Sequence, residues 1–116
     1  MIRKSVIAGS WYPGNPSVLK KDIERYFNAV SGPDVQGDVV GLIAPHAGYV
    51  YSGQVAAYAY RLIRGKQYDA VIIVGPSHRV AFHGVSVFSR GGYETPLGMV
   101  PVAEDLAEKI KAASTV

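Results

Sequence analysis

Apolar residues occur along this chain in two patterns, a helical spacing and short continuous runs. The first pattern predicts helices and the second predicts strands. The segment that follows Asn15-Pro16 carries apolar residues at i, i+4, i+7, i+8 and i+11, which is a helical stripe. Asparagine is a favoured N-cap and proline suits the first helical position, so a helix begins here and ends before Ser31-Gly32-Pro33. The stripe comprises Leu19, Ile23, Tyr26, Phe27 and Val30.

The same period predicts two further helices. The first follows Ser52, which is placed as its N-cap, shows an apolar face from Val55 to Ile63 and ends at Gly65. The second covers Ala103 to Ala113, with acidic residues in its first turn and lysines in its last. That charge order suits the helix dipole.

Two continuous apolar runs, Val39–Ala44 and Ala70–Val74, predict strands that are buried on both faces. Each run is followed by a proline and then a histidine, His46 after the first and His78 after the second. About two dozen residues separate the runs, which is enough for a crossover between parallel strands. Ligands bind at the carboxyl edge of such sheets. We therefore expect both imidazoles at one site.

Shorter strands are expected at Ile2–Ile7, Val85–Phe88 and Val100–Val102, with turns at Gly91-Gly92 and Thr95–Gly98. Strands alternate with helices along the whole chain. The pattern therefore predicts the α/β class with a parallel sheet.

The composition narrows the function classes. At 116 residues, 48% hydrophobic and 18% charged, the chain fits one globular domain. The net charge of +3 comes from scattered basic residues, which does not indicate a nucleic-acid partner. No run of about 18 apolar residues and no secretory signal is present, so no membrane association is expected. Because cysteine is also absent, a cytoplasmic location is the expectation.

Two imidazoles suit iron, zinc, copper or nickel, but such a site needs a third protein ligand. Asp69 begins the strand that leads to His78 and so lies at its opposite end. Glu94 would reach the site only if its loop folded over the sheet edge, and His83 is expected in an exposed loop. The residues therefore supply two ligands of a metal site, or alternatively two solvated loop histidines.

Trp11 and Tyr12 lie in a turn-rich segment. They either pack that segment onto the core or form the aromatic wall of a pocket. Ser77 beside His78 is not interpreted as a nucleophile, because adjacent residues rarely align as nucleophile and base and no orienting carboxylate is evident. No catalytic residue is assigned. The helix after His46 points its N-terminus at the His46 loop, which mildly favours an anionic ligand there.

Four motifs occur in order along the chain: Ala8-Gly9-Ser10-Trp11-Tyr12-Pro13, Ala44–Gly53, Gly75-Pro76-Ser77-His78 and Thr95-Pro96-Leu97-Gly98. The set resembles the Memo-like family, also called the AmmeMemoRadiSam system protein B family. That family is similar in fold to the class III extradiol ring-cleaving dioxygenases, which use non-haem Fe(II).

The resemblance implies an αβα sandwich with a mainly parallel central sheet, of which residues 1–116 would be the N-terminal part of a single domain. It also implies a metal-binding pocket to which His46 and His78 contribute, with iron as the first candidate and zinc or copper as alternatives. Within the same motifs, the residues expected to line the pocket or bind ligand are Trp11, Tyr12, Tyr49, Tyr51 and Ser77.

Two functions stay open. The first is a metal-binding protein with a dioxygenase-like pocket for a small aromatic molecule; whether it is an enzyme is undecided, since the third ligand is absent. The second is a signalling module that binds a phosphopeptide or protein in the same pocket without catalysis. Family members are more than twice this length, and their downstream half completes the pocket. The chain is therefore expected to form a homo-oligomer or to depend on a C-terminal half, either of which would cover apolar surface.

Overall fold

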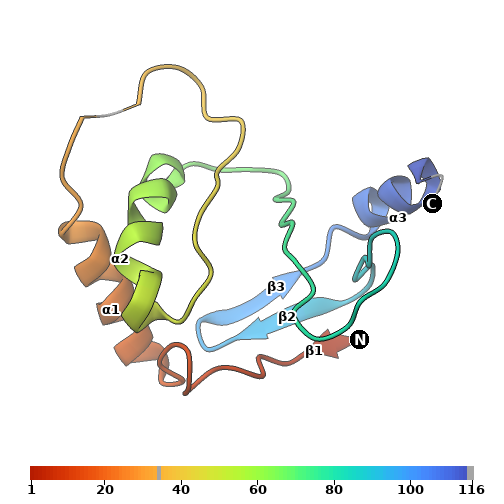
Figure 1. Ribbon diagram of the computed structural model, residues 1–116, viewed down its shortest axis with the longest axis horizontal. Coiled ribbons are helices and arrows are strands. Elements are labelled where there is room, and N and C mark those ends of the chain that lie inside the picture. Colours follow the sequence, from red (N-terminus) through yellow and green to blue (C-terminus); the bar gives the residue numbers. More distant parts are fainter. Residues whose placement is uncertain (34, 115–116) are drawn as a thin grey trace. The chain divides into compact units, whose positions relative to one another are not determined.

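The computed structural model describes residues 1–33 and 35–114. It contains both helices and strands, which confirms the α/β class. No helix in the described ranges is long and apolar enough to span a membrane. The elements in Figure 1 are β1 (Ile2–Arg3), α1 (Pro16–Asn28), α2 (Tyr49–Tyr60), the 3-10 turn η1 (Arg61–Ile63), β2 (Gly92–Thr95), β3 (Gly98–Pro101) and α3 (Glu104–Ala113).

The chain divides into two compact units. The helical unit comprises Ser5–Lys66 together with Thr95–Gly98, and it contains α1, α2 and η1. The sheet unit comprises Met1–Lys4, Gln67–Glu94 and the described residues from Met99 onward. This division matters for the site, because the predicted ligands His46 and His78 fall in different units.

Helix α1 forms where the sequence predicts it. The Asn15 side chain accepts hydrogen bonds from the backbone N–H groups of Ser17 at 2.9 Å and Val18 at 3.1 Å. These bonds satisfy two of the amides that a helix leaves unpaired at its start. On the predicted apolar stripe, Leu19 is buried at 3% exposure. Gly32, just beyond the helix, has φ of +116°, which suits the predicted stop.

Helix α2 begins earlier than expected. Its N-cap is Gly48, so the prediction that Ser52 caps it is wrong. The Tyr49 N–H donates to the carbonyl oxygen of Trp11 at 2.8 Å, and this distant carbonyl binds an amide of the first turn. Ser52 lies inside the helix and its hydroxyl donates to the Ala47 carbonyl at 3.1 Å.

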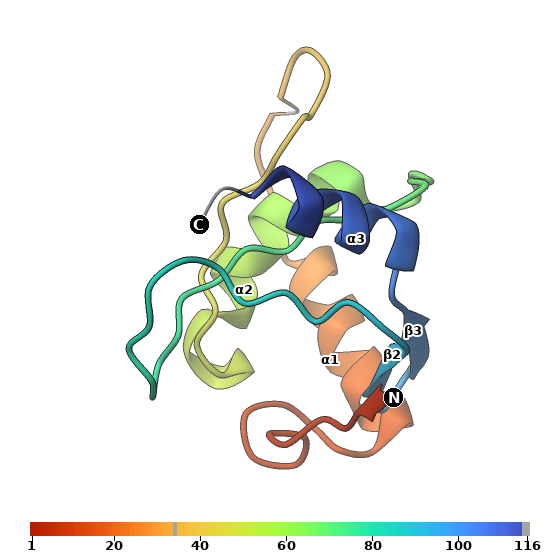
Figure 2. The ribbon, with the colours of Figure 1, turned by 90° about the vertical axis from the view of Figure 1, so that its right-hand side faces the viewer.

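Helices α1 and α2 lie side by side, as both views show (Figures 1 and 2). Leu19 of α1 and Ala57 of α2 are buried. The Tyr26 hydroxyl donates to the Tyr49 carbonyl at 3.0 Å, and the Gln54 amide donates to the Tyr26 carbonyl at 3.0 Å. The two helices are thus joined by apolar contact and by two hydrogen bonds.

The sheet unit is built on three strands in the order β1-β2-β3, with β1 parallel to β2 and Ile2 opposite Gly92. A two-residue turn joins β2 to β3, so these neighbours are antiparallel. Before β2, Gly91 has φ of +90° and donates its amide to Glu104 at the start of α3, at 2.9 Å. The turn at Thr95–Gly98 and the helix after Ala103 therefore form as predicted, while the strand β2 at Gly92–Thr95 was not predicted.

The strand predictions differ from the structure. Val39–Ala44, Ala70–Val74 and Val85–Phe88 form no strand, the first strand covers Ile2–Arg3 in place of Ile2–Ile7, and the last covers Gly98–Pro101 in place of Val100–Val102. A strand exists only where a neighbouring strand pairs with it, and within the predicted strand Ile2–Ile7 the residues that pair with β2 are Ile2 and Arg3. The local sequence is suited to strands in the other segments, but their pairing is not formed.

We predict that Gly53→Ala destabilises the helical unit. A Cβ at Gly53 would lie 2.8 Å from Cε2 and 3.0 Å from Cζ of Tyr26, whose ring is held by its hydroxyl bond. Such overpacking costs about 1–3 kcal/mol, which outweighs the roughly 0.5–1 kcal/mol gained by replacing a helical glycine. Chemical denaturation followed by circular dichroism measures the change. Gly41→Ala is the control, because a Cβ there meets nothing within 4 Å; equal stability of both variants would contradict the packing.

Candidate functional site

The helical unit contains a pocket of about 470 Å³. It lies among the Trp11 loop, the facing sides of α1 and α2, and the loop that leads into α2. All of its lining residues belong to the helical unit. They are Ile7, Trp11, Tyr12, Ile23, Tyr26, Phe27, Pro45, His46, Ala47, Gly48, Tyr49, Ser52, Gly53, Ala56, Ala57, Tyr60 and Arg64.

The Trp11 loop is held by its own backbone. The Trp11 N–H donates to the Ile7 carbonyl at 3.0 Å, and the Gly9 N–H donates to the Tyr12 carbonyl at 2.8 Å. The Tyr12 hydroxyl is also hydrogen-bonded to the Ser5 hydroxyl. Trp11 remains 46% exposed although its backbone is fixed. A fixed, half-exposed indole is well placed to contact a ligand.

Three tyrosine rings form the aromatic cluster of the pocket. The rings of Tyr12 and Tyr49 lie 5.5 Å apart between centroids, and those of Tyr26 and Tyr49 lie 6.2 Å apart, nearly edge to face. These separations are typical of favourable aromatic pairs. Burial, together with the neighbouring tyrosines, raises the pKa of Tyr49 above 10.0. The cluster therefore favours the neutral phenol of Tyr49.

His46 borders this cluster because the chain enters α2 directly beside it. The Gly48 backbone passes close to the Trp11 loop, where a Cβ would lie 3.3 Å from the Trp11 carbonyl oxygen. The Ser52 hydroxyl bond to Ala47 holds the same entry loop. His46 is itself exposed. It can present an imidazole to a metal ion or donate a hydrogen bond to a ligand that lies on the aromatic wall.

Arg64 places a positive charge at another part of the pocket. Its guanidinium bonds Glu24 at 2.7 Å and stacks on the Phe27 ring at 4.7 Å from the centroid. Both partners of this ion pair are nearly half exposed, so it adds little to stability. The stacking on Phe27 fixes the guanidinium beside the pocket.

Four of the predicted site residues meet in the pocket: Trp11, Tyr12, His46 and Tyr49. Tyr51 is on the first turn of α2 but is 85% exposed and does not line the pocket.

The remaining two predicted site residues, Ser77 and His78, are in the sheet unit. The Ser77 hydroxyl donates to the Val80 carbonyl at 2.5 Å and accepts the Val80 N–H at 3.3 Å. These bonds close a local turn that contains His78.

The metal site remains a prediction. Within residues 1–33 and 35–114, no three or more His, Cys, Asp or Glu side chains come together as a group that could hold a metal ion. The two predicted ligands lie in different units, His46 in the helical unit and His78 in the sheet unit. Two imidazoles do not complete the ligand set of a zinc or non-haem iron site.

The polar pocket residues that were not predicted include Tyr26, Tyr60 and Arg64. Tyr26 follows the apolar stripe of its helix, so the sequence indicates packing. Arg64 matches the end of a helix, and Tyr60 lies outside the predicted apolar face. The sequence offers one signal for such a tyrosine. A half-buried Tyr on an apolar helix face usually directs its hydroxyl group to a hydrogen-bond partner, which points to a polar contact beside the packing.

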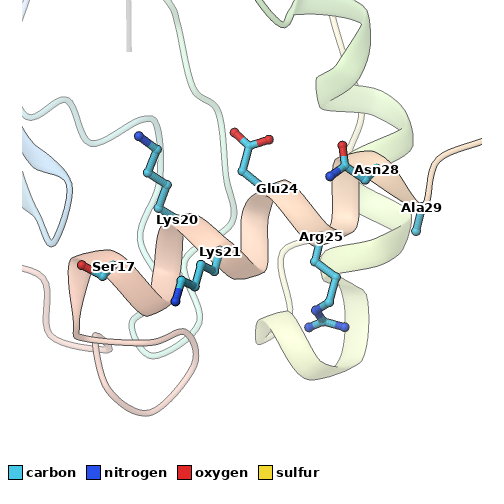
Figure 3. A pocket seen from close by; sticks show the side chains of 7 residues that line it. All are labelled: Ser17, Lys20, Lys21, Glu24, Arg25, Asn28 and Ala29. Atoms are coloured by element: carbon cyan, nitrogen blue, oxygen red, sulfur yellow. The ribbon is translucent and has the colours of Figure 1, made fainter.

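A larger, open hollow of about 780 Å³ runs along the exposed side of α1 (Figure 3). Lys20 and Glu24 point to one side of the helix there, while Lys21 and Arg25 point to the other. Arg25 bonds Asp22 at 3.3 Å, and Glu24 is bound by Arg64. None of the predicted site residues lines this hollow. We therefore take the aromatic pocket as the candidate site.

The fold and pocket define an α/β protein with a histidine-bordered aromatic pocket. The model of the family described as "Memo-like protein" matches residues 3–116, and the chain belongs to this family.

Similar proteins include a MEMO1 family protein of Nitrosopumilus maritimus, 41% identical over 114 residues, which cover 95% of this chain and 42% of that protein. A MEMO1 family protein of Methanothermobacter thermautotrophicus is 39% identical over 123 residues, covering 100% of this chain and 44% of that protein. The "Protein memo-1 homolog" of Caenorhabditis elegans is 37% identical over 110 residues, covering 95% and 31% respectively. The chain thus spans less than half the length of these relatives.

Folding raises the pKa of Tyr49, so it contributes stability that is present below pH 10.0 and is lost as the pH rises through the raised value. We expect Tyr49→Phe to remove a component of the phenolate absorbance titration that lies above pH 10.0. Tyr51→Phe, which also removes one phenol, is expected to leave that component in place. Identical titrations of the two variants would contradict the burial of Tyr49.

Proposed function

We propose that this chain is the part of a Memo-like protein that binds a transition metal ion through His46 and His78, beside a pocket that accepts a small aromatic ligand. One observation carries the proposal: His46 borders a pocket whose wall includes Trp11, Tyr12 and Tyr49. Neutral imidazole is a good ligand for iron, zinc and copper. Iron is the first candidate, by resemblance to the extradiol dioxygenases.

The two histidines leave coordination positions that other groups must fill. A bound metal ion would supply Lewis acidity and a place for a bidentate ligand, such as a compound with two neighbouring phenolic oxygens. This chain's own contribution is to hold the aromatic part of such a ligand. The Trp11 and Tyr12 rings offer flat apolar surface, and their backbones are fixed by hydrogen bonds.

We expect His46→Ala and His78→Ala each to weaken the binding of Fe(II), Zn(II) or Cu(I) by about tenfold or more, as is typical when a metal site is disrupted. Isothermal titration of the purified chain measures the affinity. His83→Ala is the matched control, since His83 is exposed and lies outside the predicted site.

Equal affinity of the wild type, His46→Ala and His78→Ala would refute the proposed ligands. Circular dichroism of each variant checks that the helices persist. Turnover of a catechol-like substrate by the metal-loaded chain would favour an enzyme over a binding protein.

A second function uses the same pocket without a metal ion. The N-terminus of α2 lies at the pocket and favours an anionic group. Such a group would compete with Glu24 for the Arg64 guanidinium, which also lies at the pocket. A phosphotyrosine peptide would combine a ring for the aromatic wall with a phosphate for these groups. This second candidate is a phosphopeptide-binding module.

Under this second function, phosphopeptide binding should survive a chelator and both histidine substitutions but be lost in Trp11→Ala. Tyr58→Ala is the matched control, because Tyr58 is 45% exposed against 46% for Trp11 and does not line the pocket. Fluorescence anisotropy of a labelled peptide measures the affinity. Equal losses in the two aromatic variants would count against a specific contact in the pocket.

A further inference from the structure

Arg64 brings a positive charge to a pocket whose other walls are mainly aromatic and apolar. Its guanidinium stacks on the Phe27 ring, 4.7 Å from the centroid, and its Nη2 donates to Oε2 of Glu24 at 2.7 Å. Arg64 and Phe27 line the pocket, whereas Glu24 lines the open hollow along the exposed side of α1. The guanidinium therefore lies between the pocket and a carboxylate of the chain itself.

The ion pair of Arg64 can be exchanged for a pair with a ligand. A guanidinium presents five N–H donors in a planar fork that suits carboxylates. Within residues 1–33 and 35–114, its hydrogen bonding comprises the bond to Glu24, so further donors are available to a ligand. The two side chains are 47% and 44% exposed, and an exposed pair of this kind contributes little to stability. A second carboxylate can therefore take the place of Glu24 at low cost.

The aromatic wall and Arg64 belong to opposite ends of α2. Tyr49, the first residue of the helix, donates its N–H to the Trp11 carbonyl, while Arg64 follows η1 beyond the last turn. The 12 residues of α2 span about 18 Å, at a helical rise of about 1.5 Å per residue. Between these ends the pocket wall includes the buried Ala57. A single ring that lies against Trp11 is much shorter than this pocket and leaves its Arg64 end unoccupied.

We propose that the ligand of this pocket is an arylalkanoic acid, which combines an aromatic ring, an apolar chain and a terminal carboxylate. This inference rests on the proposed function for the ring, which lies against Trp11. The chain follows α2, and the carboxylate binds Arg64 in place of Glu24. A carboxylate is the matching anion because Arg64 already binds one. Glu24 is thus an internal competitor, since it occupies the guanidinium of the empty pocket and its negative charge opposes a bound anion.

The test compares acids of increasing chain length, from benzoate through phenylpropionate to phenylhexanoate, with their neutral amides. Isothermal titration of the whole chain in the presence of a chelator measures the affinities without any metal ion. Burial of each methylene should add about fourfold for acid and amide alike. A preference for the acid over its amide should appear only in the longer compounds, and it should reach about tenfold or more when the carboxylate meets Arg64.

Arg64→Gln should reduce this acid-over-amide preference to about one. Arg25→Gln is the matched control, because Arg25 also pairs with a carboxylate, that of Asp22 at 3.3 Å, and also stacks on a ring, that of Tyr26 at 4.6 Å. Arg25 does not line the pocket and points to the opposite side of α1 from Glu24 (Figure 3). Its variant should keep the full preference.

Glu24→Gln should have the opposite effect and raise the preference for the longest acid by about threefold or more, since it removes the competitor. A gain of this kind cannot arise from loss of folding. Asp22→Asn is the control, because it makes the same change of charge on the same helix, at a carboxylate that pairs with Arg25 and does not line the pocket. It should not raise the preference.

Equal affinities of acid and amide along the whole series would overturn this inference and leave the aromatic pocket of the proposed function in place. Equal binding of a long alkanoic acid without a ring, dependent on Arg64, would support the carboxylate site while refuting the aromatic wall. A rise in preference in both Glu24→Gln and Asp22→Asn would overturn the role of Glu24 as competitor. Failure of every compound to bind would overturn both the inference and the aromatic pocket.

Discussion

The peptide group of Tyr49 and its side chain hold the helical unit together. The Tyr49 N–H is bound by the Trp11 carbonyl, and its carbonyl accepts the Tyr26 hydroxyl. Its ring packs against Tyr12 and Tyr26. One residue therefore connects the N-terminal loop, α1 and α2, and the pocket is the space that these three segments enclose. Loss of any one of these contacts would release a wall of the pocket.

This arrangement requires small residues where the segments come closest. Gly48 allows the Trp11 carbonyl to approach the start of α2, and Gly53 leaves room for the Tyr26 ring. Neither glycine has a positive φ, so close approach and not backbone conformation is the reason for glycine at these positions. The same packing fixes the entry loop that carries His46.

The sequence predicts the elements whose determinants are local. The Asn15 cap, the hairpin turn at Thr95–Gly98 and the charges of α3 each act within a few residues, and each element forms where expected. The strands predicted at Val39–Ala44 and Ala70–Val74 do not form, because a strand also requires a neighbour to pair with, which a local pattern cannot reveal. The prediction that Ser52 caps α2 is wrong for a similar reason, since the Trp11 carbonyl that binds the first turn of α2 is far away in sequence.

The same distinction applies to the candidate site. The motifs predict Trp11, Tyr12, His46 and Tyr49 as site residues, while Tyr26 and Arg64 line the pocket because α1 and α2 pack together. Each predicted ligand histidine lies in a segment that local bonds hold, the Ser52 bond to Ala47 for His46 and the Ser77 bond to Val80 for His78. A metal ion bound by both imidazoles requires ligand distances that hold within a few tenths of an ångström. An aromatic ligand of the helical unit requires only the walls of one pocket, so the two proposed functions make different demands on the same fold.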